Sequence, residues 1–429
     1  MFGRLARAGG AFGLGCLLTA ALAAGAAAEP IDCTGPAPDA QPGTAAWHQR
    51  EVENAYCATQ RVIDTNTNPA YFAAIATTQG TARPLTGMDP AREPTALAGS
   101  RFRFDELTIA DATGKQFPTF LFRPCDTSCT NMPPGLQRFE PPYPAVVIMH
   151  GGAANHEMYL WAAEGLAEAG YMVVTVNLTD RTDNTHYEAT KTALDWLLST
   201  PAQPFADGSH NPHWSELDRG RIGLAGHSAG GVAVSRLGQE DPRVRAIVSW
   251  DRAQSTAMPE DLQLRTPALF FTADYNCQKV PVCLPEPRDA APDPLGPGTK
   301  DEDFQRVRAA GIDTMKVSLR AAVHLDFTEW PELNASRYGA VTAFYYTLAW
   351  FDRYLKGDTL ATQRLTAETF DDSADVHNIS TGRWDPGTLR NLPAQIAGQP
   401  VVDRLSFNFR SGYWLEGGAL ACESMRAGC

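Results

Sequence analysis

Short, continuous apolar runs alternate with amphipathic segments through the middle of this chain. The runs are four to six residues long and lie at 145–149, 171–176, 221–225, 246–250, 268–271 and 314–319. Runs of this length are typical of strands that are buried on both faces. Segments with helical spacing lie at 157–169, 187–198, 231–237, 301–310 and 337–355. Strands that alternate with helices predict a mostly parallel sheet with helices on both faces.

A different pattern precedes the first buried run. Residues 101–109 and 116–123 each alternate between apolar and polar positions, and the turn-forming segment 111–114 (Asp-Ala-Thr-Gly) separates them. This pattern predicts a β-hairpin. We therefore expect an antiparallel edge on the N-terminal side of the sheet.

The first 28 residues have the layout of a secretory signal peptide. Arg4 and Arg7 form a basic start, residues 11–22 are apolar, and small residues at 26–28 precede Glu29. The apolar stretch is short for a membrane span. We expect export to the periplasm or the medium, with a retained anchor, or a lipid attached at Cys16, as the alternatives.

The periodic region is flanked by segments with weaker patterns. We expect an N-terminal extension over 29–99, an α/β domain over 100–356 and a C-terminal extension over 357–429. Residues 284–300 are dense in proline and predict a surface insertion. No internal repeat is visible.

Composition and charge exclude several classes of protein. The 429 residues are 44% hydrophobic and 20% charged, which is typical of a globular protein, and the net charge is −13. A nucleic-acid binder needs clustered Lys and Arg, and this chain has no basic run. No amphipathic basic helix supports membrane attachment, so stable membrane insertion is not expected.

Cysteine usage agrees with export. Eight of the nine cysteines lie outside the signal segment and form pairs that are close in sequence. The pairs are Cys33/Cys57, Cys125/Cys129, Cys277/Cys283 and Cys422/Cys429. An even number in an exported chain predicts disulfides, although spacing alone leaves the connectivity open. A zinc site that uses Cys125 and Cys129 is the alternative, but no second pair with zinc-ligand spacing stands nearby.

The segment Gly226-His227-Ser228-Ala229-Gly230 lies between a predicted strand and a predicted helix. This is the Gly-x-Ser-x-Gly pattern of a nucleophile elbow, in which a tight turn exposes the serine hydroxyl at the edge of a sheet. The strand–turn–helix context makes the motif more specific than its letters alone. We predict that Ser228 is a catalytic nucleophile, and the alternative is an ordinary turn serine.

A second motif follows the buried run at 145–149. The sequence His150-Gly151-Gly152-Ala153 is similar to the loop that supplies one oxyanion donor in α/β-hydrolases. The other donor comes from the residue after the nucleophile. We therefore predict an oxyanion hole formed by the backbone N–H groups of Gly152 and Ala229, and the alternative is a glycine turn without function.

A general base is expected after the last strand of the sheet. His324 follows the run at 314–319 across a short loop, where it can reach the serine hydroxyl. Two acids are candidates for orienting it. Asp251 ends the run at 246–250, Asp274 follows the run at 268–271, and either carboxylate can hold an imidazole. We favour Asp251 and keep Asp274 as the alternative.

Residues 100–330 resemble an α/β-hydrolase of the platelet-activating-factor acetylhydrolase and bacterial polyester-hydrolase (cutinase-like) neighbourhood. The resemblance to the acetylhydrolase rests on 226–228, on 249–251, on 269–271 with Asp274-Tyr275, and on 319–324 with Phe327. Segment 177–187 also resembles the part of that family after its second core strand. In that family the acid follows the strand that corresponds to the one ending at Trp250, which supports Asp251. In the polyester-hydrolase branch the acid follows the next strand, and this chain departs there with Asn276.

These features predict an exported serine esterase with the triad Ser228, Asp251 and His324 and with no metal or organic cofactor. Its substrates would be short-acyl phospholipid esters, small carboxylic esters or polyester chains. Trp161 and Trp250 are predicted to contact an apolar substrate, with a core role as the alternative. A serine peptidase of the same fold and a non-catalytic binding protein on a hydrolase scaffold remain the competing hypotheses. The sequence leaves the oligomeric state open.

Overall fold

The structure of the protein is a computed structural model. It describes residues 46, 98–152, 154–178, 185–252, 258–275, 301–328, 339–366, 409–425 and 429, with the pairs 377–378, 383–384, 395–396 and 399–400. The predicted signal peptide, nearly all of the N-terminal extension and the proline-dense segment 284–300 lie outside the described residues. The same holds for Cys33, Cys57, Cys277, Cys283 and Asn276.

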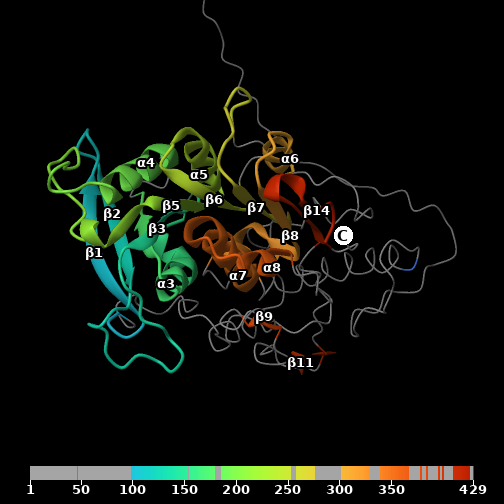
Figure 1. Ribbon diagram of the computed structural model, residues 1–429, viewed down its shortest axis with the longest axis horizontal. Coiled ribbons are helices and arrows are strands. Elements are labelled where there is room, and N and C mark those ends of the chain that lie inside the picture. The colour runs from blue at the N-terminus through green and yellow to red at the C-terminus, as the bar shows by residue number, and fades with distance from the viewer. Residues whose placement is uncertain are drawn as a thin grey trace, which may run out of the picture. The chain divides into compact units, whose positions relative to one another are not determined.

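A ten-stranded mixed sheet organises the described chain (Figure 1). Its strands are β1 (Phe102–Ala110), β2 (Gln116–Pro124), β3 (Tyr143–Met149), β4 (Met172–Val176), β5 (Leu217–His227), β6 (Val244–Trp250), β7 (Ala268–Tyr275), β8 (Thr314–Val323), β13 (Phe409–Leu415) and β14 (Leu420–Cys422). Their order across the sheet is β1-β2-β4-β3-β5-β6-β7-β8-β13-β14. Neighbouring strands from β4 to β8 pair in parallel. The β1–β2 hairpin pairs with β4 antiparallel, so the predicted antiparallel N-terminal edge is confirmed.

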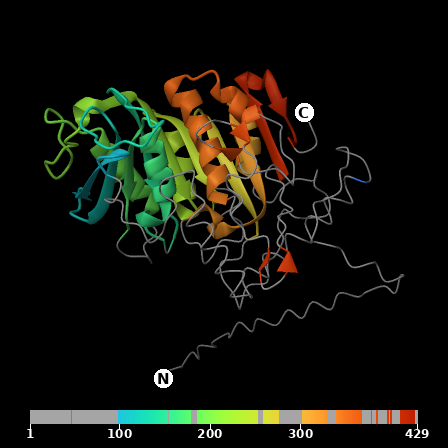
Figure 2. The same cartoon turned by 90° about the horizontal axis from the view of Figure 1, so that it is seen from below.

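Helices cover both faces of this sheet (Figures 1 and 2). They are α3 (Leu160–Glu168), α4 (His186–Leu197), α5 (Ala229–Glu240), α6 (Glu302–Ala309), α7 (Gly339–Phe351) and α8 (Ala361–Thr366). Short 3-10 turns lie at His156–Tyr159, Trp214–Glu216, His324–Phe327 and Glu416–Gly418, and a π-helical turn at Asp352–Lys356 continues α7. Two small strand pairs join His377–Asn378 to Arg383–Trp384 and Gln395–Ile396 to Gln399–Pro400.

Two apolar clusters form the core, one on each face of the sheet. One contains buried residues of α3, α7 and α8, and the other contains buried residues of α4, α5 and α6. Successive side chains of a strand point to opposite faces, so β3 supplies both clusters. Val146 and Ile148 belong to the first cluster, and Val147 and Met149 belong to the second. This two-sided burial explains why the strands appear as continuous apolar runs in the sequence.

The strands at the far edge were not predicted. β13 pairs antiparallel with β8 and with β14, so residues of the expected C-terminal extension complete the sheet. Cys422 of β14 is bonded to Cys429, which links this edge to the end of the chain. The second described disulfide, Cys125–Cys129, follows β2, and it replaces the zinc alternative for that pair.

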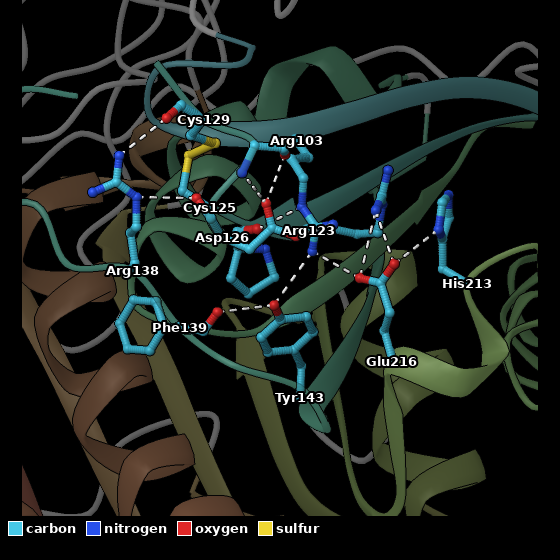
Figure 3. Close-up of polar contacts among 12 residues, drawn as sticks. Arg103, Arg123, Cys125, Asp126, Cys129, Arg138, Phe139, Tyr143, His213 and Glu216 are labelled. Carbon is cyan, nitrogen blue, oxygen red and sulfur yellow. Dashed lines mark hydrogen bonds and ion pairs between the residues drawn. A yellow bond between two sulfur atoms is a disulfide. The ribbon is translucent and has the colours of Figure 1, made fainter. Parts of the chain in front are cut away.

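Ion pairs connect the β1–β2 hairpin to the start of β5 (Figure 3). Glu216, just before β5, accepts contacts from Arg103 at 2.7 Å and from Arg123 at 3.2 Å. Arg123 also lies 2.9 Å from Asp105, and His213 Nδ1 lies 3.1 Å from Glu216. We call this set the Glu216 cluster. It links elements that are more than 90 residues apart in sequence.

Candidate active site

Ser228 stands on a strained turn between β5 and α5. Its backbone has φ 56° and ψ −118°, which is unusual for a residue with a side chain. Its N–H donates to the Trp250 carbonyl at 3.1 Å, so the turn is tied to the end of the neighbouring strand β6. Strain of this kind, held by the surrounding structure, is what a nucleophile elbow requires.

Gly230 allows α5 to start close to β3. A Cβ atom at this position would collide with the backbone oxygens of Met149 and His150. Only glycine therefore permits the helix to begin directly against the end of that strand. The close approach brings the loop after β3 next to Ser228.

His324 and Asp251 form a hydrogen-bonded pair at the same edge of the sheet. His324 Nδ1 lies 2.6 Å from Asp251 Oδ2. The other carboxylate oxygen, Oδ1, accepts from the Ala273 N–H at 3.1 Å. Asp251 is fully buried and His324 is 5% exposed. A carboxylate on Nδ1 favours the imidazole tautomer whose Nε2 is unprotonated, which is the form a general base needs.

The structure thus brings His324 to the acid that we favoured from the sequence. The backbone of Asp274, the alternative, lies in β7, one strand farther along the sheet. Asn276 lies outside the described residues. The carboxylate that contacts His324 is that of Asp251.

The three predicted triad residues follow the ends of β5, β6 and β8. The carboxyl ends of parallel strands meet at one edge of a sheet, which explains how residues 228, 251 and 324 come together. Within the described residues, the Ser228 hydroxyl forms no hydrogen bond to His324. Catalytic hydrogen bonds are often long without substrate and tighten when it binds.

Gly152 and Ala229 are adjacent, as an oxyanion hole requires. A Cβ atom at Gly152 would lie 4.0 Å from Ala229 Cβ. Ala229 is the first residue of α5, so its N–H has no acceptor within the helix. The preceding N–H of the loop, that of Gly151, donates to Tyr159 Oη at 3.2 Å. Gly152 is therefore the better candidate for the second donor.

Trp161 and Trp250 lie in the core, which supports the alternative core role and not the predicted contact with substrate. Both side chains are fully buried. Trp161 Nε1 donates to the Phe327 carbonyl at 3.1 Å, and Trp250 Nε1 donates to Thr347 Oγ1 at 3.0 Å. Their ring centroids are 5.0 Å apart. Neither side chain presents an exposed surface to a ligand.

Two buried polar residues near the site escaped the sequence analysis. His227 and Tyr159 contact each other and the loops that carry the site. The only available signal for His227 was its place in the motif, directly before Ser228. Tyr159 lies in the segment 157–169, whose helical spacing indicates no polar role for its hydroxyl.

Comparison with known proteins agrees with this fold. Residues 138–282 match the PETase family, described as PET hydrolase-like. Cutinase 2 of Thermobifida cellulosilytica is 23% identical over 228 residues, which are 52% of this chain and 72% of that protein. Cutinase est1 of Thermobifida alba is 23% identical over 226 residues, covering 52% and 64% of the two chains. Cutinase cut1 of Thermobifida fusca is 23% identical over 228 residues, covering 52% and 60%. The α/β-hydrolase fold and the resemblance to bacterial polyester hydrolases are confirmed.

Proposed function

Since the central domain of this protein is an α/β-hydrolase similar to cutinases and PET hydrolase-like proteins, we propose that the protein is an exported serine hydrolase of carboxylic esters. One observation carries the proposal. Ser228 occupies a strained strand-to-helix turn, and a buried imidazole–carboxylate pair lies at the same edge of the sheet.

The proposed reaction has two half-reactions that use the same groups. Ser228 Oγ attacks the ester carbonyl carbon while His324 Nε2 takes the hydroxyl proton. The carbonyl oxygen becomes an oxyanion that the N–H groups of Gly152 and Ala229 stabilise. The carbon–oxygen bond to the alcohol then breaks, and the alcohol leaves with the proton from His324. Water, deprotonated by His324, attacks the acyl-enzyme and releases the acid and the free serine.

Asp251 acts in this scheme through its contact with His324. Its carboxylate holds the imidazole in one tautomer and stabilises the imidazolium that forms in each half-reaction. The Ala273 N–H fixes the carboxylate itself. No step of this mechanism needs a metal or an organic cofactor.

The substrate class follows from the relatives. They are named cutinases and PET hydrolase-like proteins, so we propose polyester or other apolar carboxylic esters as substrates. Disulfides persist in oxidising compartments, and the described Cys125–Cys129 and Cys422–Cys429 bonds support export to such a compartment. A polymer is too large to enter a cell, which also requires an exported enzyme.

Hydrolysis of a p-nitrophenyl ester series from acetate to dodecanoate tests the proposal. The protein and its Ser228→Ala variant are compared on the series, on a short-acyl phospholipid and on an amorphous polyester film. We expect ester hydrolysis that the variant loses, and release of soluble acids from the film. A folded protein that cleaves none of the esters would contradict the proposal. Cleavage of peptide amides alone would support the peptidase hypothesis, and no cleavage of either class would support a binding role.

A further inference from the structure

Tyr159 and His227 form a buried, hydrogen-bonded chain that links the loop after β3, the elbow and the His324 turn. The Gly151 N–H lies 3.2 Å from Tyr159 Oη. Tyr159 Oη lies 2.7 Å from His227 Nδ1, and His227 Nε2 lies 2.8 Å from the backbone carbonyl of His324. The chain thus runs from the loop after β3, through the residue before the nucleophile, to the backbone of the predicted base.

The donors and acceptors determine where the protons lie. The Gly151 N–H is a donor, so Tyr159 Oη accepts from it and its own hydrogen points to His227 Nδ1. The His324 carbonyl can only accept, so His227 Nε2 carries a proton. With His227 as a neutral imidazole protonated on Nε2, all three hydrogen bonds point from Gly151 toward His324.

Burial keeps the chain in this state. Tyr159 is fully buried and His227 is 1% exposed. Burial also raises the pKa of the Tyr159 hydroxyl well above its usual value of 10, so it remains a donor. The Tyr159 ring packs parallel to Trp250, with centroids 6.2 Å apart and an interplanar angle of 7°. The ring is therefore held by packing, and the hydroxyl is available to direct the hydrogen bonds.

We propose that Tyr159 and His227 are positioning residues that set the oxyanion loop and the catalytic imidazole relative to each other through this chain. The inference rests on the proposed function. The His324 turn is also held at its other end, where Trp161 donates to the Phe327 carbonyl. His227 holds the first residue of this turn through the His324 carbonyl.

Removal of the Tyr159 hydroxyl, with a matched control, tests the hydrogen bonds from Gly151 to His227. Tyr159→Phe removes the hydroxyl and keeps the packed ring. Tyr171→Phe removes another fully buried hydroxyl, which donates to Asp352 at 2.8 Å and has no described contact with the site. Tyr159→Phe loses two hydrogen bonds to neutral groups and Tyr171→Phe loses one to a carboxylate, so both variants are expected to lose stability. Only Tyr159→Phe is expected to slow the chemistry.

Two readouts separate positioning from a structural role. The first is the second-order rate constant for reaction with a fluorophosphonate, in which Ser228 Oγ displaces fluoride from phosphorus and no ester is needed. The second is the separation of kcat from KM on p-nitrophenyl esters. A loop misplaced by a fraction of an ångström affects the transition state more than substrate binding. We expect Tyr159→Phe to lower the fluorophosphonate rate and kcat by about 10- to 100-fold, with KM nearly unchanged.

Two substitutions of His227 test its hydrogen bond to the His324 carbonyl. His227→Gln keeps a donor that reaches the His324 carbonyl, whereas His227→Leu removes both polar ends. We expect the Gln variant to react with the fluorophosphonate at least about tenfold faster than the Leu variant. We also expect Tyr159→Phe to add little to the loss in His227→Leu, because one chain carries both effects.

The outcomes for the proposal and for the function are distinct. Wild-type protein that reacts with the fluorophosphonate but cleaves no ester would contradict the proposed function and leave the positioning test intact. Reactive wild type with an equally reactive Tyr159→Phe variant would overturn the positioning role alone. Equal rates for the Gln and Leu variants would also overturn it. Wild type that neither reacts nor hydrolyses would overturn both.

Discussion

His324 Nδ1 lies 2.6 Å from Asp251 Oδ2, although the two residues are separated by 73 positions in the sequence. The second oxygen of the carboxylate is held by the Ala273 N–H, so the pair has one defined geometry. Asp251→Asn keeps the shape but replaces the acceptor that selects the imidazole tautomer. We expect kcat for ester hydrolysis to fall on the order of 10³- to 10⁴-fold, with little change in melting temperature.

Asp274→Asn is the matched control for this prediction, because Asp274 is the other acid that the sequence allows. We expect it to retain most of the activity. If steady-state kinetics show that Asp274→Asn loses activity and Asp251→Asn retains it, Asp274 is the acid of the triad and the assignment of Asp251 is wrong.

Gly230→Ala is expected to destabilise the protein and to abolish activity together. The new Cβ would collide with the Met149 and His150 backbone oxygens, which cannot move without displacing β3. We expect a loss of about 1–3 kcal/mol in the free energy of unfolding, measured by urea denaturation. Gly220→Ala is the control, because a Cβ there meets only Asp218 Oδ1 at 3.4 Å. Equal stability of the two variants would refute the close approach of α5 and β3.

A buried ion pair lies directly beside the predicted acid. Arg252 Nη1 contacts Asp303, and the two side chains are 3% and 0% exposed. Arg252→Met removes the guanidinium from a fully buried carboxylate, whose contact with Arg306 is longer, at 3.7 Å. Breaking such a pair from one side is costly, whereas replacing both partners is not. We expect a loss of about 3–5 kcal/mol by urea denaturation.

The double variant Arg252→Met/Asp303→Leu tests whether that loss arises from the Asp303 carboxylate, buried without the Arg252 guanidinium. It is expected to recover most of the stability. A double variant as unstable as Arg252→Met would show that the guanidinium acts through packing.

Acid sensitivity is expected from the Glu216 cluster (Figure 3). Burial raises the pKa of Glu216, but the hydrogen bond from His213 and the charges of Arg123 and Arg103 outweigh it, and the pKa falls from the usual 4.5 to about 2. A lowered pKa in the folded state means that the ionised group stabilises the fold. This contribution is complete above pH 4.5 and is lost as the pH falls from 4.5 toward 2.

Glu216→Gln is therefore expected to lower the stability at pH 7 by about 1–3 kcal/mol. The difference from wild type should shrink below pH 4.5 and vanish near pH 2, as followed by urea denaturation across this range. Glu260→Gln, at an exposed glutamate with no ion pair among the described residues, is the control and should show no such trend. A difference that stays constant with pH would contradict the electrostatic origin.

Much of this fold could be predicted because its local patterns agree with its long-range pairing. Val146 to Met149 form an apolar run because β3 is covered on both faces. The turn of the β1–β2 hairpin lies between Ala110 and Gln116, in the polar segment that predicted it. Candidates for the nucleophile and the base could be named from the sequence because a glycine motif and a histidine follow predicted strands. The sequence favoured Asp251 over Asp274 but left both open, since both follow strands, and the contact with His324 separates them.

Other features of the fold and the site leave no signal in the local sequence pattern. β13 has a register shift between Phe409 and Gly412 and pairs with a strand about 90 residues earlier, so its local pattern does not show its partner. Tyr159 and His227 are 68 positions apart in the sequence, so their hydrogen bond depends on long-range packing that a local pattern does not show. Trp161 and Trp250 show the same limit, because an aromatic residue near a site is equally compatible with the core and with a ligand surface.

The acyl-enzyme is the most direct test of the proposed mechanism. Protein mixed with p-nitrophenyl acetate, quenched in acid and digested, is examined by mass spectrometry for the acetylated peptide. The account predicts an acetyl group on Ser228, formed at the rate of the p-nitrophenol burst and absent from the Ser228→Ala variant. Hydrolysis without this adduct, at a rate that the variant retains, would contradict it.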